Sequence, residues 1–268
     1  MKILLIGDVV GRPGRAIIGR DVARLREELA VDLVVANCEN AAGGSGITPN
    51  VADEFFRAGV DILTSGNHVW KKREAFELLK RDPRIIRPAN YPDGAPGTGS
   101  TIVETLSGQK VGVLNIMGRV FMAPLDCPFR TADRELSRLK LVTPVIIVDM
   151  HAEATSEMVA MGWHLDGKVS CVFGTHTHIP TADERILPKG TAFITDVGMT
   201  GPYDSVIGRR VDQILERFLS SLPNKSEVAE ENIQLRGLLV DVNPVTGKAL
   251  SVERVTRCFD GAVRGAGD

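Results

Sequence analysis

The stretch KILLIG, residues 2–7, is a continuous apolar run that is followed at once by Asp8. Such a run is typical of a β-strand covered on both faces, because a strand with one face in water alternates apolar and polar residues. DLVVAN, residues 32–37, has the same character. Between the two runs, apolar side chains recur at helical spacing, at Ile18, Val22, Leu25 and Leu29. The beginning of the chain therefore predicts a β-α-β unit.

The rest of the chain repeats this pattern of strand, loop and helix. Further strands are predicted at 60–66, 144–152, 168–176 and 191–198. Helices are predicted at 48–59, 153–164 and 209–220. Two hairpins are predicted, one from 100–106 and 110–116 and a C-terminal one from 233–242 and 248–257. We expect a mixed α/β fold, a layered α/β/α sandwich, in a single domain spanning 1–268.

The composition limits the classes of function. Of the 268 residues, 43% are hydrophobic and 25% charged, and the net charge of −2 argues against bulk binding of nucleic acid. A small nucleotide or an RNA end remains possible as substrate, because a local site needs few cations. No apolar run approaches the roughly 20 residues of a membrane helix, and residues 1–11 are too short and too soon interrupted for a signal peptide. We expect a cytoplasmic protein without membrane contact.

Polar side chains follow five of the predicted strands at their carboxyl ends. They are Asp8, Glu39, Asn40, Asn67, His68, His151, His176 and His178. Each has an ordinary structural reading by itself, as a helix cap, a turn residue or a hydrogen-bonded histidine. Ligands of open α/β sheets bind outside the carboxyl ends of the strands, so the alignment of eight such residues at one edge of one sheet indicates a site. His164 does not fit the alignment, and we interpret it as a surface or capping residue.

This set of side chains is too large for one metal ion and suits two ions that share a carboxylate. Two ions about 3.5–4 Å apart can generate a bridging hydroxide and hold phosphate oxygens during in-line displacement. His68 lies next to Asn67, where a protonated imidazole could neutralise a leaving alkoxide. The long loop at 117–130 is either a lid over a base or ribose or a subunit contact, and the loop at 197–207 is a candidate for one wall of the site.

The motifs GNH (66–68) and GTHTH (174–178), with Asp8 and His151, resemble those of the calcineurin-like metallophosphoesterase superfamily. Val10 stands where that superfamily carries a histidine, and Glu39-Asn40 replaces its bridging aspartate. These departures, with the stretches ANCENAAGGSGIT (36–48) and TDVGMTGPYDSVIG (195–208), are similar to the YmdB-like bacterial branch. The resemblance covers nearly the whole chain.

The resemblance implies a cytoplasmic, homo-oligomeric phosphodiesterase with two metal ions, iron being favoured over manganese or zinc. The implied activity is that of a 2′,3′-cyclic-nucleotide 2′-phosphodiesterase, which yields 3′-nucleotides, with His68 as the catalytic residue. The implied ligands of one metal are Asp8, Glu39, Asn40 and His178, and those of the other are Glu39, Asn67, His151 and His176. A phosphomonoesterase, a nuclease or a non-catalytic nucleotide-binding regulator remain as alternatives.

Overall fold

The strands form two sheets of six strands each in the computed structural model, which describes residues 1–259. The first sheet contains β1 (Lys2–Ile6), β2 (Leu33–Asn37), β3 (Ile62–Thr64), β10 (Gly201–Pro202), β11 (Ile233–Val242) and β12 (Ala249–Phe259). The second contains β4 (Ser100–Glu104), β5 (Lys110–Met117), β6 (Ile146–His151), β7 (Cys171–Thr175), β8 (Arg185–Ile186) and β9 (Ala192–Ile194). The strands β1, β2 and β3 run parallel, as do β5, β6, β7 and β9.

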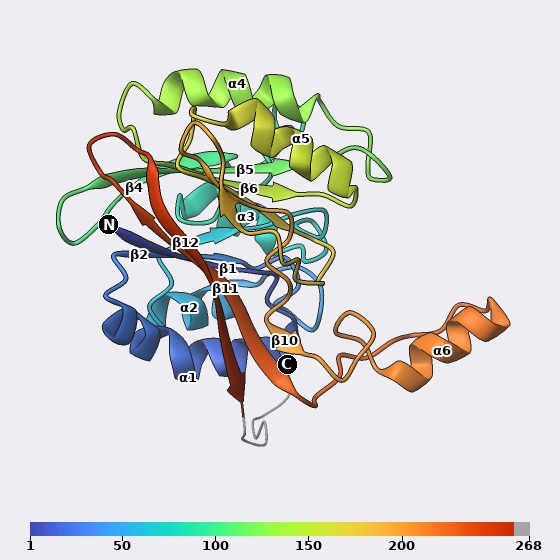
Figure 1. Cartoon of the computed structure of the whole chain (residues 1–268). Helices are drawn as coiled ribbons and strands as arrows, with labels where there is room; N and C mark the ends of the chain where they lie inside the picture. The colour runs from blue at the N-terminus through green and yellow to red at the C-terminus, as the bar shows by residue number, and fades with distance from the viewer. Residues whose placement is uncertain (260–268) are drawn as a thin grey trace.

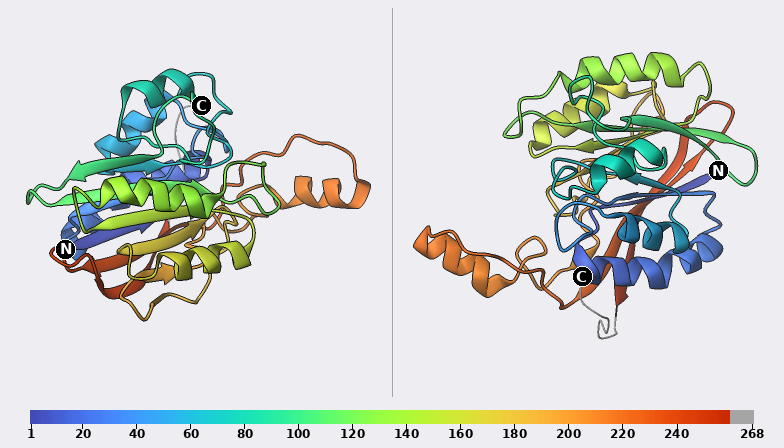
Figure 2. Two further views of the ribbon diagram at one scale, coloured as in Figure 1. Left: turned by 90° about the horizontal axis from the view of Figure 1, so that it is seen from above. Right: turned by 180° about the vertical axis from the view of Figure 1, so that it is seen from behind.

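Helices cover the outer face of each sheet, giving four layers (Figures 1 and 2). The helices are α1 (Gly11–Leu29), α2 (Pro49–Arg57), α3 (Ala75–Arg81), α4 (Pro128–Leu139), α5 (Thr155–Leu165) and α6 (Val211–Ser220). The first sheet lies against α1 and α2, and the second lies against α4 and α5. The inner faces of the two sheets pack on each other through a shared apolar cluster.

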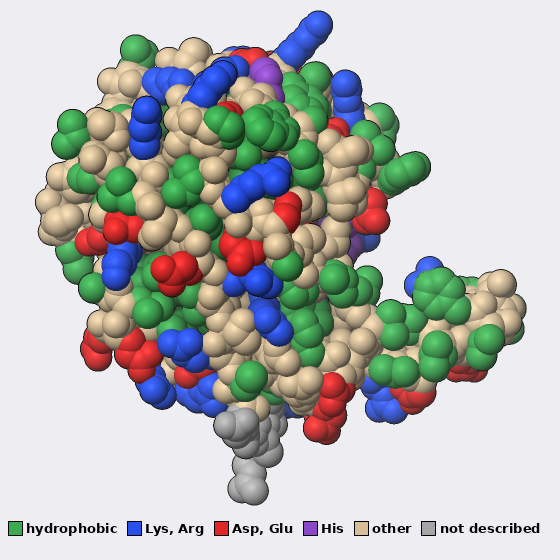
Figure 3. All heavy atoms as spheres, viewed as in Figure 1, with side chains coloured by type: hydrophobic (Ala, Val, Ile, Leu, Met, Phe, Trp, Pro, Cys, Tyr) green, Lys and Arg blue, Asp and Glu red, His purple; other side chains and the backbone are tan. Residues whose placement is uncertain are grey.

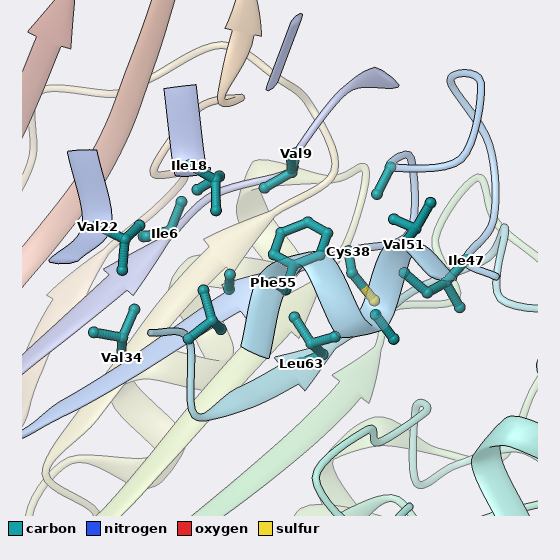
Figure 4. Packing of buried hydrophobic residues seen from close by; sticks show 14 of the residues in the cluster. Ile6, Val9, Ile18, Val22, Val34, Cys38, Ile47, Val51, Phe55 and Leu63 are labelled. Carbon is teal, nitrogen blue, oxygen red and sulfur yellow. The ribbon is translucent and has the colours of Figure 1, made fainter. Parts of the chain in front are cut away.

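The alternation of side chains along each strand explains this arrangement. Leu4 and Ile6 of β1 belong to the cluster under α1 and α2, whereas Ile3 and Leu5 belong to the cluster between the sheets. Figure 4 shows the outer cluster, in which Phe55 of α2 lies among side chains from β1, α1 and β3. Both faces of the strand are therefore buried, as the continuous apolar run predicts.

The layered α/β fold and the C-terminal hairpin are confirmed, but the strands form two facing sheets, whereas we expected the strand ends to lie at the edge of one sheet. The second face of the first sheet is covered by another sheet and not by helices. Residues 260–268, which the expected single domain includes, lie outside the described part of the chain.

Three helices differ from the expectation: α1 in where it begins, and α3 and α4 because no helix was predicted there. Helix α1 begins at Gly11, earlier than the apolar spacing indicated, because Pro13 is well tolerated in a first turn. Helix α4 begins inside the loop expected at 117–130, with Pro128 in its first turn. Its buried residues Ala132, Leu136 and Leu139 have helical spacing, which was the available signal.

Helix α6 projects away from the layered body on two extended segments (Figures 1 and 2). Its side chains Leu215, Phe218 and Leu219 are exposed, and the space-filling view in Figure 3 shows apolar atoms along this arm. Within residues 1–259, no helix is both long enough and apolar enough to cross a membrane.

Candidate metal centre

Glu39 lies at the middle of the polar cluster, directly after β2, and is almost completely buried. Its Oε2 atom accepts the backbone N–H of His68 at 3.0 Å and lies 3.2 Å from Nε2 of His151. Its Oε1 atom lies 3.1 Å from Nδ2 of Asn40. One oxygen of the carboxylate therefore faces His151 and the other faces Asn40, which is the arrangement that a bridging ligand needs.

His151 ends β6, so its side chain reaches the same place from the opposite sheet. Nε2 of its ring lies 3.0 Å from Oδ1 of Asn67 and 3.1 Å from Nδ1 of His176. The outer nitrogen, Nδ1, lies 2.9 Å from Oγ1 of Thr175. The ring is completely buried, and its inner nitrogen is surrounded by ligand-type atoms.

His176 and His178 follow β7 with positive φ angles of 100° and 68°, which non-glycine residues rarely adopt. Asp196 holds this strained turn, because one of its oxygens accepts both the N–H and the hydroxyl of Thr177, at 3.1 and 2.8 Å. The outer ring nitrogens are also occupied: Nε2 of His176 lies 3.2 Å from Glu153, and Nδ1 of His178 donates to the carbonyl of Ile207 at 2.9 Å. An outer partner fixes which ring nitrogen is left for a ligand.

Asp8, directly after β1, is completely buried. Its Oδ2 atom accepts the backbone N–H of His176 at 2.9 Å. Its Oδ1 atom is buried and, among the described residues, has no hydrogen-bond partner. A buried carboxylate oxygen without a partner is costly, and a bound cation would satisfy it.

Asn40 and His68 bond to each other at the open side of the cluster. Nδ1 of His68 donates to Oδ1 of Asn40 at 2.7 Å, and Nδ2 of Asn40 lies 3.1 Å from Nε2 of His178. Asn40 therefore directs its amide nitrogen to His178, which belongs to the same implied ligand set, and its oxygen to His68. The side chain of His68 is about one-third exposed (32%), so its imidazole lies where a substrate would arrive.

Gly66 is a functional residue that sequence reasoning missed. A Cβ atom at this position would lie 2.2 Å from Nε2 of His151 and 2.3 Å from Oε2 of Glu39. Only a residue without a side chain leaves the space in which these two ligand atoms meet. The GNH motif contains the signal, although nothing in the motif indicates that the glycine faces His151.

Burial and neighbouring charge set the protonation of the cluster. Burial opposes the ionisation of Glu39, but His151 and His68 outweigh it and hold the pKa of that carboxyl well below its usual range. Burial also opposes a charge on His151, yet the Glu39 carboxylate outweighs it and raises the pKa of His151 to about 9. Burial and the charge of His151 lower the pKa of His176 to about 4. The ring of His151 thus holds a proton for which a cation would compete.

The donor atoms fit metal ions. Single ligand atoms of Glu39, His151 and His176 lie within 4.8 Å of one another. The unpartnered oxygen of Asp8 and the space in front of Gly66 belong to the same cluster. Imidazole, carboxylate and amide donors suit Zn²⁺, Fe²⁺ and Mn²⁺ alike, so the chemistry of the donors indicates metals without selecting one.

All eight residues predicted at the strand ends meet here, from two facing sheets and not from one sheet edge as expected. His164 is elsewhere and pairs with Asp133 at 3.0 Å, in agreement with its interpretation as a surface residue. Arg15, near the first loop, pairs with Glu54. A hollow of about 300 Å³ between α1 and α2 contains no such cluster of ligand-type side chains. The types of side chain that meet, and not the size of a hollow, therefore identify the site.

A layered α/β fold with this cluster at the ends of its strands defines the metallophosphoesterase class of enzymes. The family described as "YmdB-like protein" matches residues 4–255, and the chain belongs to that family. A 2′,3′-cyclic-nucleotide 2′-phosphodiesterase of Bacillus subtilis (strain 168) is 47% identical over 255 residues, with 95% of this chain and 96% of that protein covered.

Two solved structures have nearly the same fold. A protein of Thermus thermophilus has a TM-score of 0.91 at 40% identity, with 96% of this chain and 99% of that chain covered. A crystal structure described as a novel phosphatase of Mycoplasma pneumoniae has a TM-score of 0.90 at 35% identity, with 96% and 93% covered. These similarities extend over the whole described body and are not limited to the motifs.

Proposed function

We propose that this enzyme hydrolyses 2′,3′-cyclic nucleotides to 3′-nucleotides at a centre for two metal ions. Water adds to phosphorus, the bond between phosphorus and the 2′ oxygen breaks, and the phosphate stays on the 3′ oxygen. The observation that carries the proposal is the Glu39 carboxylate, which directs one oxygen to each group of ligand atoms. The 47% identity with a curated enzyme of that activity supports the choice of substrate.

The proposed ligands of one ion are Asp8, Glu39, Asn40 and His178, and those of the other are Glu39, Asn67, His151 and His176. When bound, the two ions would activate water and stabilise the charge that develops on the phosphate oxygens. For Asn40 to bind through its oxygen, its amide must turn away from His68. We propose iron as the native metal, with manganese or zinc as alternatives that the same donors accept.

His68 is the proposed catalytic acid. Its backbone N–H is held by Glu39, and its Nδ1 donates to Asn40, so the ring is fixed at the open side of the centre. In this orientation Nε2 is the nitrogen left to deliver a proton to the departing 2′ oxygen.

A substrate panel tests the activity. We expect turnover of 2′,3′-cyclic nucleotides with a 3′-nucleotide as the product, identified by chromatography against 2′- and 3′-standards. A phosphomonoesterase would act on nucleoside monophosphates instead, and a nuclease would act on linear dinucleotides. Stoichiometric metal with no turnover of any of these would support the non-catalytic regulator.

We also propose that the chain acts as one domain in a cytoplasmic homo-oligomer. The shared cluster between the sheets supports a single domain, because neither sheet covers its inner face alone. The projecting helix α6 supports the oligomer, since Phe218 is 78% and Leu219 86% exposed. Replacing both by glutamate should reduce the molar mass in light scattering, whereas an unchanged mass would assign the subunit contact to another surface.

A further inference from the structure

A buried carboxylate, Asp149, lies beneath the centre between the two sheets, and neither the resemblance nor the ligand set uses it. Its Oδ1 atom accepts the hydroxyl of Thr175 at 2.7 Å. Its Oδ2 atom accepts the hydroxyl of Thr64 at 2.5 Å and the side-chain amide of Asn37 at 3.0 Å. All four side chains are completely buried. The simplest interpretation is that Asp149 is a buried, fully hydrogen-bonded carboxylate that links the two sheets. The hydrogen bond from Thr175 indicates a second role.

The hydroxyl of Thr175 has one proton and two lone pairs. Because the proton is donated to Asp149, the oxygen can only accept from its other neighbours. One neighbour is Nδ1 of His151 at 2.9 Å, and the other is the amide of Asn37 at 3.4 Å. Nδ1 of His151 must therefore carry a hydrogen, so Nε2 is the nitrogen through which the ring can bind a metal. That is the nitrogen that faces Glu39 and Asn67.

We propose that Asp149, acting through Thr175, is a positioning residue that sets the tautomer and orientation of His151 for metal binding. This inference rests on the proposed metal centre, since it explains how one of its ligands is prepared. The same network joins the centre to the packing of the sheets, because Asn37 and Thr64 come from the first sheet and Asp149 and Thr175 from the second. The carboxylate thus connects the fold to the geometry of the site.

The experiment measures the affinity of the metal-free full chain for Zn²⁺ by calorimetric titration, together with its melting temperature. Thr175→Val removes the hydroxyl but keeps the shape of the side chain, and Thr175→Ser keeps the hydroxyl. Thr64→Val is the matched control, because it removes a bond to the same carboxylate that does not lead to His151. Asp149→Asn replaces the acceptor with a group that also donates.

We expect Thr175→Val and Asp149→Asn to weaken binding of one Zn²⁺ by about 10–100-fold, the usual effect of losing an outer partner of a ligand. Thr175→Ser should restore it to within about threefold of the parent, and Thr64→Val should lower the melting temperature with little change in affinity. Equal affinities for Thr175→Val and the parent would overturn the inference, as would equal losses for Thr175→Val and Thr64→Val. A parent chain that binds no Zn²⁺, Mn²⁺ or Fe²⁺ would instead contradict the metal centre itself.

Discussion

The two halves of the centre differ in how far their side chains are already oriented. The first half contains Asn67, His151 and His176, the second contains Asp8, Asn40 and His178, and Glu39 lies between them. In the first half, Nε2 of His151 lies 3.0 Å from the oxygen of Asn67 and 3.1 Å from Nδ1 of His176. In the second half, Asn40 directs its amide nitrogen to His178 and its oxygen to His68.

The difference shows that the orientation of each donor group, and not only its type, decides how far a site is prepared for a metal ion. The rings of both halves have outer partners, Thr175 and Glu153 in the first and the carbonyl of Ile207 in the second, but the second half must also turn an amide before Asn40 binds through oxygen. Val10, which stands where the resemblance implies a histidine in the wider superfamily, is buried with its side chain against Gly208. We therefore expect the second half to bind its ion more weakly than the first.

Removing the carboxylate that both halves share should have the largest effect. Glu39→Gln keeps the size of the side chain but replaces one oxygen with an amide nitrogen that cannot bind a metal. We expect both ions to be lost. The affinity for metal should fall by more than the roughly 100-fold that loss of an outer partner of a ligand can cause. Elemental analysis measures the ions, and Glu135→Gln, which changes a mostly buried carboxylate bonded to Ser100, is the control. Two retained ions would refute the bridge.

Removing His68 should impair the reaction without emptying either half. For His68→Gln we expect kcat to fall by about 10²–10⁴-fold, the usual contribution of a general acid, because no proton reaches the leaving oxygen. The metal content should stay at the parent level, since the ring contacts Asn40 and is not a proposed ligand. Steady-state kinetics and elemental analysis on one preparation check this. If His68→Gln lost metal as well as activity, His68 would instead support the structure of the second half.

Single-ligand variants should separate the two halves. We expect the parent to bind two Zn²⁺ ions with affinities at least about tenfold apart, because one half must reorient and the other is prepared. His176→Ala should lose the tighter ion and His178→Ala the weaker one in calorimetric titration. If the two variants lose the same ion, the assignment of the halves is wrong.

Removing the exposed outer partner should have the smallest effect. Glu153 is 52% exposed and lies 3.2 Å from Nε2 of His176, whereas Asp149 is completely buried. Solvent weakens such an exposed pair, so Glu153→Gln should reduce the affinity of the first half by only about threefold. Titration of Glu153→Gln and Asp149→Asn with Zn²⁺ under the same conditions compares their losses of affinity. Equal losses would show that burial does not decide the strength of an outer partner here.

Much of the centre could be predicted from sequence, because the side chains that follow a strand are placed by the strand itself. Asp8, Glu39 and His151 each come directly after or at the end of an apolar run, and all three reach the cluster. The spacing in GTHTH also placed both imidazoles, but the positive φ angles of His176 and His178 were not foreseen. Those angles depend on Asp196, which is far along the chain and holds the turn.

By itself, the sequence determined the buried strands, the C-terminal hairpin and the types of ligand at the strand ends, since these follow from local periodicity and from neighbours in the chain. Only the tertiary structure decided that two sheets face each other, that Gly66 leaves space for His151, and which nitrogen of each ring faces the centre. These features depend on contacts such as that of Asn37 with Asp149, which are distant in sequence and meet only when the sheets pack. No local pattern encodes such a contact, because it forms only when burial of both apolar inner faces brings the sheets together.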